Sequence, residues 1–279
     1  MNNVINIPDI ANGLEIKDDI WICKSHSSYS YPYSGNELCF SVEENSFWFK
    51  HRSNCVIEVI KKFPPPNNTL FDIGGGNGYV SESLTKEGIN TYLVEPGEQG
   101  IKNAKIRGLK NLICSTIEDA GFKKESLPSV GLFDVIEHID DDTKFLHTIR
   151  DYLVKGGRLY ATVPAYSLLW SKDDVYAGHF RRYRRKELED KFTKTGFSLN
   201  YSTYLFSFLP LPIFLFRKIP GILRKEKNID LQEYTRYHQV RSRGSNVFVQ
   251  QMCNMELKRI KKQKLIPLGS SCLMAATVE

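Results

Sequence analysis

The chain has 279 residues, of which 41% are hydrophobic and 25% are charged, and its formal net charge is +6. This composition is that of a folded globular protein and excludes a disordered or collagen-like chain. The length favours one domain with additions over two full domains. The six cysteines include no Cys-x-x-Cys pair, which argues against zinc and against a disulfide framework. We therefore expect no metal site.

The N-terminal region is expected to be an arm followed by a helix. Residues 1–35 show little periodicity and predict an irregular arm, whereas the apolar spacing of residues 42–63 predicts an amphipathic helix that the following prolines end. We place a boundary here, with an N-terminal arm and lid helix over residues 1–64 and the main domain over 65–279. The N-terminus lacks a positive region followed by an apolar core, so we expect no secretory signal and a cytoplasmic protein.

Residues 69–80 combine an apolar strand, an acidic residue and a glycine-rich turn that opens a helix. Gly74, Gly76 and Gly78 have no Cβ, so the backbone can adopt positive φ and bring its N–H groups against a ligand. Asp72, at the end of the strand, tolerates a cationic or hydroxyl-bearing ligand but would repel the pyrophosphate of NAD. By itself the turn could be an ordinary strand-to-helix connection, so the neighbouring segments must decide.

A second strand over residues 91–95 ends in Glu95, about 20 positions beyond the turn, where one carboxylate can accept hydrogen bonds from two ribose hydroxyls. Alone, Glu95 could be a solvated loop acid, and the joint spacing favours a cofactor site. Strands alternating with helices predict a mainly parallel sheet with helices on both faces. The further strands are expected over residues 112–115, 130–136 and 157–164, with a helix over 143–154.

The C-terminal part predicts a substrate-side insertion over about residues 165–245. It contains a helix from residue 185 to a stop at Gly196, a strand over 197–201 and an apolar run over 204–216. That run is too short to span a bilayer. Because basic residues follow it, it could contact an anionic membrane peripherally, or it could cap a substrate pocket or a dimer contact. A helix over 247–262 and a final apolar strand over 271–278 complete the chain, and the oligomeric state stays open.

The order of these motifs resembles that of the class I S-adenosylmethionine-dependent methyltransferases, in particular types 11 and 12. The resemblance implies a Rossmann-like, seven-stranded, mainly parallel sheet with an antiparallel last strand, and S-adenosylmethionine as cofactor. Thr116 stands where many relatives have an acid, which leaves Ile117, Glu118 or Asp119 to contact the adenine. The cofactor-binding residues implied are Asp72, Gly74, Gly76, Gly78, Glu95, Ile117, Glu118 and Asp134.

Two segments beyond strand ends carry the candidate acceptor-side residues, because ligands of open α/β sheets lie there. Residues 134–138 resemble the Asp-x-x-Glu-His segment of small-molecule methyltransferases, and residues 178–183 resemble a Gly-His-x-Arg-Arg-Tyr loop of the type 11 and 12 enzymes. His138 and His179 are candidate general bases, although His138 could instead orient loops. The candidate substrate-binding residues are Glu137, Tyr166, Arg182 and Tyr183.

The expected reaction is methyl transfer to a small or lipid- or saccharide-linked metabolite. A non-catalytic cofactor-binding subunit and an enzyme acting on a macromolecule remain alternatives. The missing Asn-Pro-Pro-Tyr motif disfavours nucleic acid, as does the lack of a basic stripe with interleaved aromatics outside residues 179–186. Aromatic rings near the N-terminus could attract a sulfonium cation, while ordinary packing would explain Phe47 and Trp48 equally well. The candidate lid residues are Tyr29, Tyr31, Tyr33, Phe47, Trp48 and His51.

Overall fold

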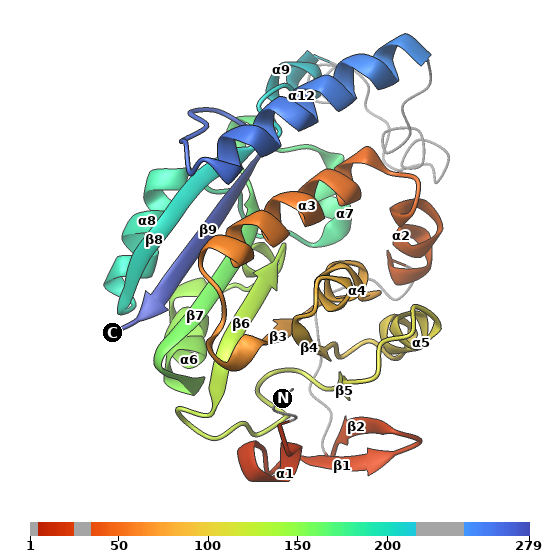
Figure 1. Cartoon of the computed structure of the whole chain (residues 1–279), viewed down its shortest axis with the longest axis vertical. Coiled ribbons are helices and arrows are strands. Elements are labelled where there is room, and N and C mark those ends of the chain that lie inside the picture. Colours follow the sequence, from red (N-terminus) through yellow and green to blue (C-terminus); the bar gives the residue numbers. More distant parts are fainter. Residues whose placement is uncertain (1–4, 25–34, 216–242) are drawn as a thin grey trace.

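The computed structural model describes residues 5–24, 35–215 and 243–279. In these residues one sheet has the strand order β1-β2-β5-β4-β3-β6-β7-β9-β8 (Figure 1). Its strands are β1 Leu14–Lys17, β2 Ile20–Cys23, β3 Thr69–Ile73, β4 Asn90–Val94, β5 Leu112–Cys114, β6 Leu127–Phe133, β7 Leu153–Pro164, β8 Phe197–Leu205 and β9 Ser271–Val278.

In this order the strands from β2 to β7 are parallel to one another, whereas β1 is antiparallel to β2 and β9 is antiparallel to both β7 and β8. The predicted Rossmann-like sheet with an antiparallel last strand is confirmed. The sheet has nine strands rather than seven, because β1 and β2 form a hairpin that adds to the edge beside β5. An irregular arm was expected there. Each of these strands has only four residues, too few to produce a recognisable alternation.

Helices cover both faces of the sheet, as the alternation predicted. Figure 1 shows α3, α4 and α5 on one face and α6 and α8 on the other. The helices are α1 Ile7–Ile10, α2 Gly35–Glu43, α3 Phe47–Lys62, α4 Tyr79–Lys86, α5 Glu98–Ile106, α6 Asp142–Tyr152, α7 Lys172–Ala177, α8 Arg185–Lys194, α9 Pro210–Ile213 and α12 Arg243–Lys261, with 3-10 turns η1 Pro66–Asn68, η2 Ile136–His138 and η3 Ser167–Leu169.

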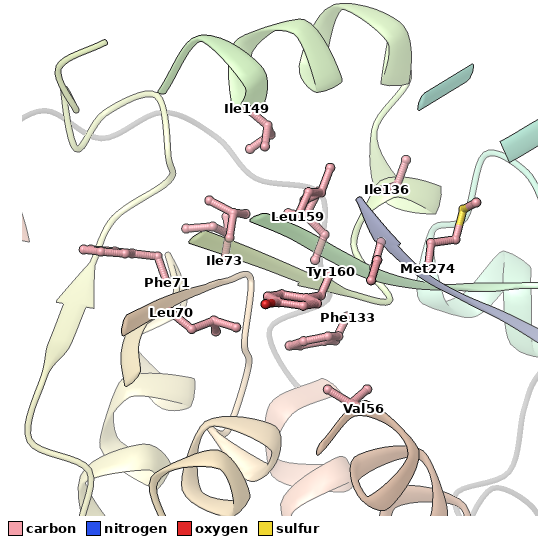
Figure 2. Close-up of a cluster of buried hydrophobic side chains, with 14 of the residues drawn as sticks. Val56, Leu70, Phe71, Ile73, Phe133, Ile136, Ile149, Leu159, Tyr160 and Met274 are labelled. Atoms are coloured by element: carbon pink, nitrogen blue, oxygen red, sulfur yellow. The ribbon is translucent and has the colours of Figure 1, made fainter. Parts of the chain in front are cut away.

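The core lies on both sides of the central strands. Every residue of β3 and β6 is buried, which is the pattern of parallel strands that helices cover on both faces. In Figure 2, Val56 of α3 and Ile149 of α6 approach the sheet from opposite faces, with Phe133 and Tyr160 between them. Each fully buried side chain of this size contributes about 1.5–3 kcal/mol, so this cluster holds the strand ends in place.

Among the predicted boundaries that differ from the structure, two affect the site. The strand expected over residues 130–136 ends at Phe133, because Asp134 adopts a φ of 61° and η2 follows. The helix expected from Val42 begins at Phe47, where the Ser46 hydroxyl accepts a hydrogen bond from the Trp48 N–H at 3.2 Å. The segment after β6 is therefore a tight turn beyond the sheet edge rather than a longer strand.

The apolar run over 204–216 is divided between two elements. Its first residues complete β8, and α9 follows, while residue 216 and the basic residues after it lie outside the described residues. Among the helices that the structure describes, we find none with both the length and the apolar character needed to cross a bilayer.

Candidate active site

A cavity of about 970 Å³ lies beyond the carboxyl ends of β3, β4, β5, β6 and β7. Ligand pockets commonly measure about 300–1,000 Å³, so this cavity is at the upper end of that range. Its position follows from the topology, since the segments after parallel strands converge at one edge of the sheet. Helix α3 closes part of the opening with Phe47, Trp48, Phe49 and Arg52.

The glycine turn after β3 forms one wall. Gly74 and Gly76 line the cavity with φ values of 66° and 55°. At Gly75 a Cβ would lie 2.2 Å from Leu93 Cδ1 and 2.7 Å from Asp72 Oδ2, so a larger residue would force these side chains to shift. Gly78 does not line the cavity. A Cβ there would meet Leu109 at 2.6 Å, so this glycine allows α4 to pack closely against the end of α5.

Two acids flank the turn. Asp72 is fully buried; its Oδ2 accepts a hydrogen bond from the Ser81 hydroxyl at 2.7 Å, and its Oδ1 has no partner among the described residues. Burial raises the pKa of Asp72 to about 6. The Glu95 carboxylate accepts from the N–H groups of Gly76 and Gly97, each at 2.9 Å. An unsatisfied buried oxygen and a preorganised carboxylate fit a ligand that carries hydrogen-bond donors.

The segment after β5 lines the next part of the cavity with Thr116, Ile117 and Glu118, whereas Asp119 lies outside the lining. Ile117 is buried and Glu118 is exposed. A buried apolar side chain beside an exposed acid can pack against a flat ring and accept a hydrogen bond at its edge. Of the three residues that the sequence offered as adenine contacts, Ile117 and Glu118 therefore line the cavity and Asp119 does not.

Asp134 reaches the cavity but already has partners. It forms an ion pair with Arg52, and its Oδ1 accepts from the Thr162 hydroxyl at 3.0 Å. The Arg52 guanidinium also lies 4.4 Å from the ring centroid of Trp48, and the residue is only 7% exposed. Sequence reasoning missed Arg52, because charged residues are seldom buried and nothing in the helix pattern predicts a partner for it. The one signal for it in the sequence is its position four residues after Trp48, which places the two side chains on the same face of a helix.

The two acceptor-side segments meet at the far wall. The Phe180 N–H donates to the Glu137 carbonyl at 2.8 Å, which joins the loop before α8 to η2. This contact brings the rings of His138 and His179 to a centroid distance of 4.7 Å, nearly perpendicular to each other. Polar atoms of Glu137, His138 and His179 lie within 4.8 Å of one another. Burial lowers the pKa of His138 to about 4, so its ring is neutral at pH 7.

Asp174 holds the loop that carries His179. Its carboxylate lies 2.9 Å from His179 Nδ1 and accepts from Arg182 Nε at 2.7 Å and from the Ser171 N–H at 2.7 Å. These donors lower the pKa of Asp174 to about 2 despite its burial, which alone would raise it. The carboxylate is therefore ionised at neutral pH. Sequence reasoning did not single out Asp174, because it stands five residues before His179 on another element.

Arg182 lines the cavity, but Tyr166 and Tyr183 do not. The N–H of Tyr183 donates to the Pro164 carbonyl at 3.0 Å, so this stretch is extended and neighbouring side chains point to opposite sides. The Tyr183 hydroxyl donates to Asp142 at 2.7 Å, away from the cavity, and Tyr166 stacks on Tyr204. Neither tyrosine therefore lies where it could make the contact with a substrate in the cavity that the sequence had predicted.

The candidate lid residues are also divided. Phe47 and Trp48 line the cavity, as do Leu209, Pro212 and Ile213 from the apolar run. His51 instead is buried outside it, with Nε2 2.9 Å from Glu256 Oε1. This pairing connects α3 to α12 and uses the imidazole for packing. Tyr29, Tyr31 and Tyr33 lie outside the described residues.

Known proteins resemble this chain in sequence and in fold. Residues 48–201, more than half of the chain, match a family model described as a methyltransferase domain. A ubiquinone biosynthesis O-methyltransferase of Hydrogenovibrio crunogenus is 28% identical over 126 residues, which cover 42% of this chain and 52% of that protein. The match thus spans about half the length of this curated relative.

Two solved structures share the fold. A possible histamine N-methyltransferase of Thermotoga maritima has a TM-score of 0.54 and 19% identity, with 87% of this chain and 94% of that chain covered. A putative methyltransferase in complex with the Haloferax volcanii Trm112 activator has a TM-score of 0.54 and 13% identity, with 88% and 93% covered. Together with the site geometry, the family match shows that this chain belongs to the methyltransferase-domain family, whose cofactor is S-adenosylmethionine.

Proposed function

We propose that this protein transfers a methyl group from S-adenosylmethionine to a small or lipid- or saccharide-linked acceptor. The observation that carries the proposal is the continuity of one cavity from the glycine turn and Glu95 to Glu137 and His179. Its volume of about 970 Å³ supports two ligands side by side. Apolar residues of α9 at the same cavity favour an acceptor with an apolar part.

The residues divide into two groups by position. Glu95 would accept hydrogen bonds from ribose hydroxyls, the free Oδ1 of Asp72 would accept from another donor, and Ile117 would pack against the base. When bound, the cofactor supplies an already activated methyl group. The protein then has to align the acceptor and remove its proton, and alignment alone can contribute about 7–11 kcal/mol to lowering a barrier. His179, at the other end of the cavity, is the candidate for proton removal.

Two alternatives remain as outcomes of the test: a cofactor-binding subunit without catalysis, and an enzyme with a macromolecular acceptor. The Haloferax volcanii neighbour is a methyltransferase assembled with an activator, and that assembly belongs to that protein. The polar groups at the acceptor end favour catalysis here, because a subunit that only binds the cofactor needs no histidine pair beside a buried acid.

Titration calorimetry tests cofactor binding first. We expect micromolar binding of S-adenosylmethionine and of its demethylated product. Glu95→Ala should weaken binding by about 1.5–3 kcal/mol, the range for hydrogen bonds to a charged group. Glu98→Ala is a matched control, because Glu98 is 79% exposed at the start of α5 and lies outside the cavity lining. No binding by the wild type, or a preference for NAD, would refute the proposal.

Incubation with methyl-labelled cofactor and fractionated cell extract tests transfer. A labelled small or lipid-like product supports the proposed acceptor class, whereas label found only in protein or nucleic acid identifies a macromolecular acceptor. Intact cofactor binding without any transfer would favour the non-catalytic alternative. His179→Ala should abolish most of the transfer while leaving cofactor affinity within about twofold, since the residue lies on the acceptor side.

A further inference from the structure

The Asp174 carboxylate sets the direction in which His179 can act. It has only acceptor atoms when ionised, so His179 Nδ1, 2.9 Å away, must carry the hydrogen of that contact. In the neutral imidazole, the lone pair is then on His179 Nε2. Asp174 is 1% exposed and is fixed in turn by Arg182 and Ser171. The neutral ring therefore has one orientation and one tautomer, with its proton-accepting nitrogen facing Glu137.

Glu137 provides a second group opposite this nitrogen. Its side chain is fully buried, it lines the cavity, and neither carboxyl oxygen has a hydrogen bond to another residue that the structure describes. Burial, and then the nearby Asp134, raise the pKa of Glu137 well above its usual range. Burial thus favours the protonated form of this carboxyl group, and a protonated carboxyl group can both donate and accept a hydrogen bond. A buried unsatisfied group of this kind needs a partner from a ligand.

The two groups are close enough for one oxygen atom, placed beside the line that joins them, to contact both. His179 Nε2 and Glu137 Oε1 are 4.0 Å apart, too far for a direct hydrogen bond. A hydroxyl oxygen about 2.8 Å from each could donate to Nε2 and accept from the carboxyl group. One alcohol or phenol group would satisfy both at once.

The charges around this gap are balanced. Asp134 pairs with Arg52, and Asp174 pairs with Arg182, while burial favours the uncharged forms of Glu137 and His138. The remaining acids that line this end of the cavity, Asp140 and Asp173, are more exposed than this inner group. An ammonium or carboxylate placed in the gap would lose its hydration beside buried groups, whereas an uncharged hydroxyl would lose much less.

We propose that the methyl acceptor is an uncharged hydroxyl compound whose hydroxyl lies between His179 Nε2 and the Glu137 carboxyl group, with Asp174 as the positioning residue of His179. This inference rests on the proposed function. The hydroxyl oxygen supplies the electron pair of the new oxygen–carbon bond, its proton passes to Nε2, and the electrons of the broken sulfur–carbon bond stay on sulfur. The Asp174 carboxylate stabilises the imidazolium that forms, and the product is a methyl ether.

The tautomer of His179 tests the positioning role without any acceptor. Two-dimensional ¹H–¹⁵N spectra of the imidazole rings should show His179 with hydrogen on Nδ1. Asp174→Asn places an amide donor opposite Nδ1 and should move the hydrogen to Nε2, whereas Asp190→Asn, a 51% exposed change on α8, should not. A wild-type ring with hydrogen on Nε2, or the same tautomer in Asp174→Asn, would overturn the proposal.

The chemistry of the labelled product tests the acceptor class. A methyl ether is uncharged and stable to mild base; a methylamine binds a cation exchanger at low pH, and a methyl ester releases labelled methanol in base. A methyl ether supports the proposal, and either other product overturns it. Failure of cofactor binding in the calorimetry would instead reject the proposed function. If the extract yields no labelled product, the ¹H–¹⁵N spectra of the His179 ring test the proposal instead.

Variants of Glu137 separate a neutral carboxyl from a charged one. Glu137→Gln keeps a donor and an acceptor, so we expect its kcat to fall at least tenfold less than that of Glu137→Leu. Asp174→Asn should lower kcat by about 10²–10⁴ with the acceptor KM nearly unchanged. Equal losses in the two Glu137 variants would overturn the proposal. So would activity that EDTA removes and a divalent cation restores, because Glu137, His138 and His179 would then be metal ligands.

Discussion

Arg107 at the end of α5 provides a sharp stability prediction. Its side chain is 5% exposed and pairs with Glu43 at 2.7 Å, with Glu82 at 3.1 Å and with Glu44. It also lies 5.2 Å from the ring centroid of Tyr79. These contacts connect α2, α4 and α5. Glu43 lines the cavity, so Arg107 also fixes one part of the site.

We expect Arg107→Gln to lower the free energy of unfolding by about 3–5 kcal/mol at pH 7, because it leaves the buried Glu43 carboxylate without its counter-charge. Glu43 is 6% exposed, whereas Glu44 is 62% exposed. Glu44→Gln also removes an ion pair to Arg107, but the Glu44 side chain is exposed to solvent. This change should therefore alter the free energy of unfolding by less than about 1 kcal/mol.

The pH dependence of this loss follows from Glu43. Burial already raises the pKa of Glu43, and removal of Arg107 takes away an attraction that lowers it. The folded pKa then lies further above the unfolded one, so ionised Glu43 opposes folding at high pH and ceases to do so as the pH falls below the unfolded pKa. Urea unfolding at pH 7 and pH 5 should show a smaller loss at pH 5. A loss no larger than that of Glu44→Gln, or one that grows with acidity, would contradict this reasoning.

Three further predictions concern the site. The pKa of Asp174 is lowered to about 2, so its ionisation stabilises the fold by about 2 kcal/mol above pH 4, and roughly half of this stabilisation should be lost at pH 3. The difference in free energy of unfolding between wild type and Asp174→Asn measures it at each pH. Gly75→Ala should lower that free energy by about 1–3 kcal/mol and weaken cofactor binding, because its Cβ would lie 2.2 Å from Leu93 Cδ1; unchanged denaturation and calorimetry would contradict this. Ile213→Ser should raise the KM of an apolar acceptor without weakening cofactor binding; salt-sensitive flotation with anionic vesicles would instead support a membrane contact of this segment.

The sequence by itself determined the elements whose patterns are local. The apolar strand before Gly74, the strand just before Glu95 and the final strand Ser271–Val278 all lie within one residue of where their patterns predict them. Buried parallel strands are continuous apolar runs, and a glycine turn needs specific residues at fixed spacing, so both can be recognised without tertiary contacts. One end of the cavity consists of these elements, and all the predicted cofactor-binding residues except Gly78 line the cavity; that they bind the cofactor stays a prediction.

The acceptor end was decided by the tertiary structure. Asp174 and His179 come from a helix and a loop, and they meet Glu137 only because that loop docks on η2 through the Phe180 N–H. The extended backbone near Tyr183 turns this tyrosine away from the cavity. Arg52 could not be predicted, because its burial depends on a carboxylate 82 positions away. Local periodicity specifies secondary structure, whereas the charge and direction of side chains in a site depend on which distant segments pack together.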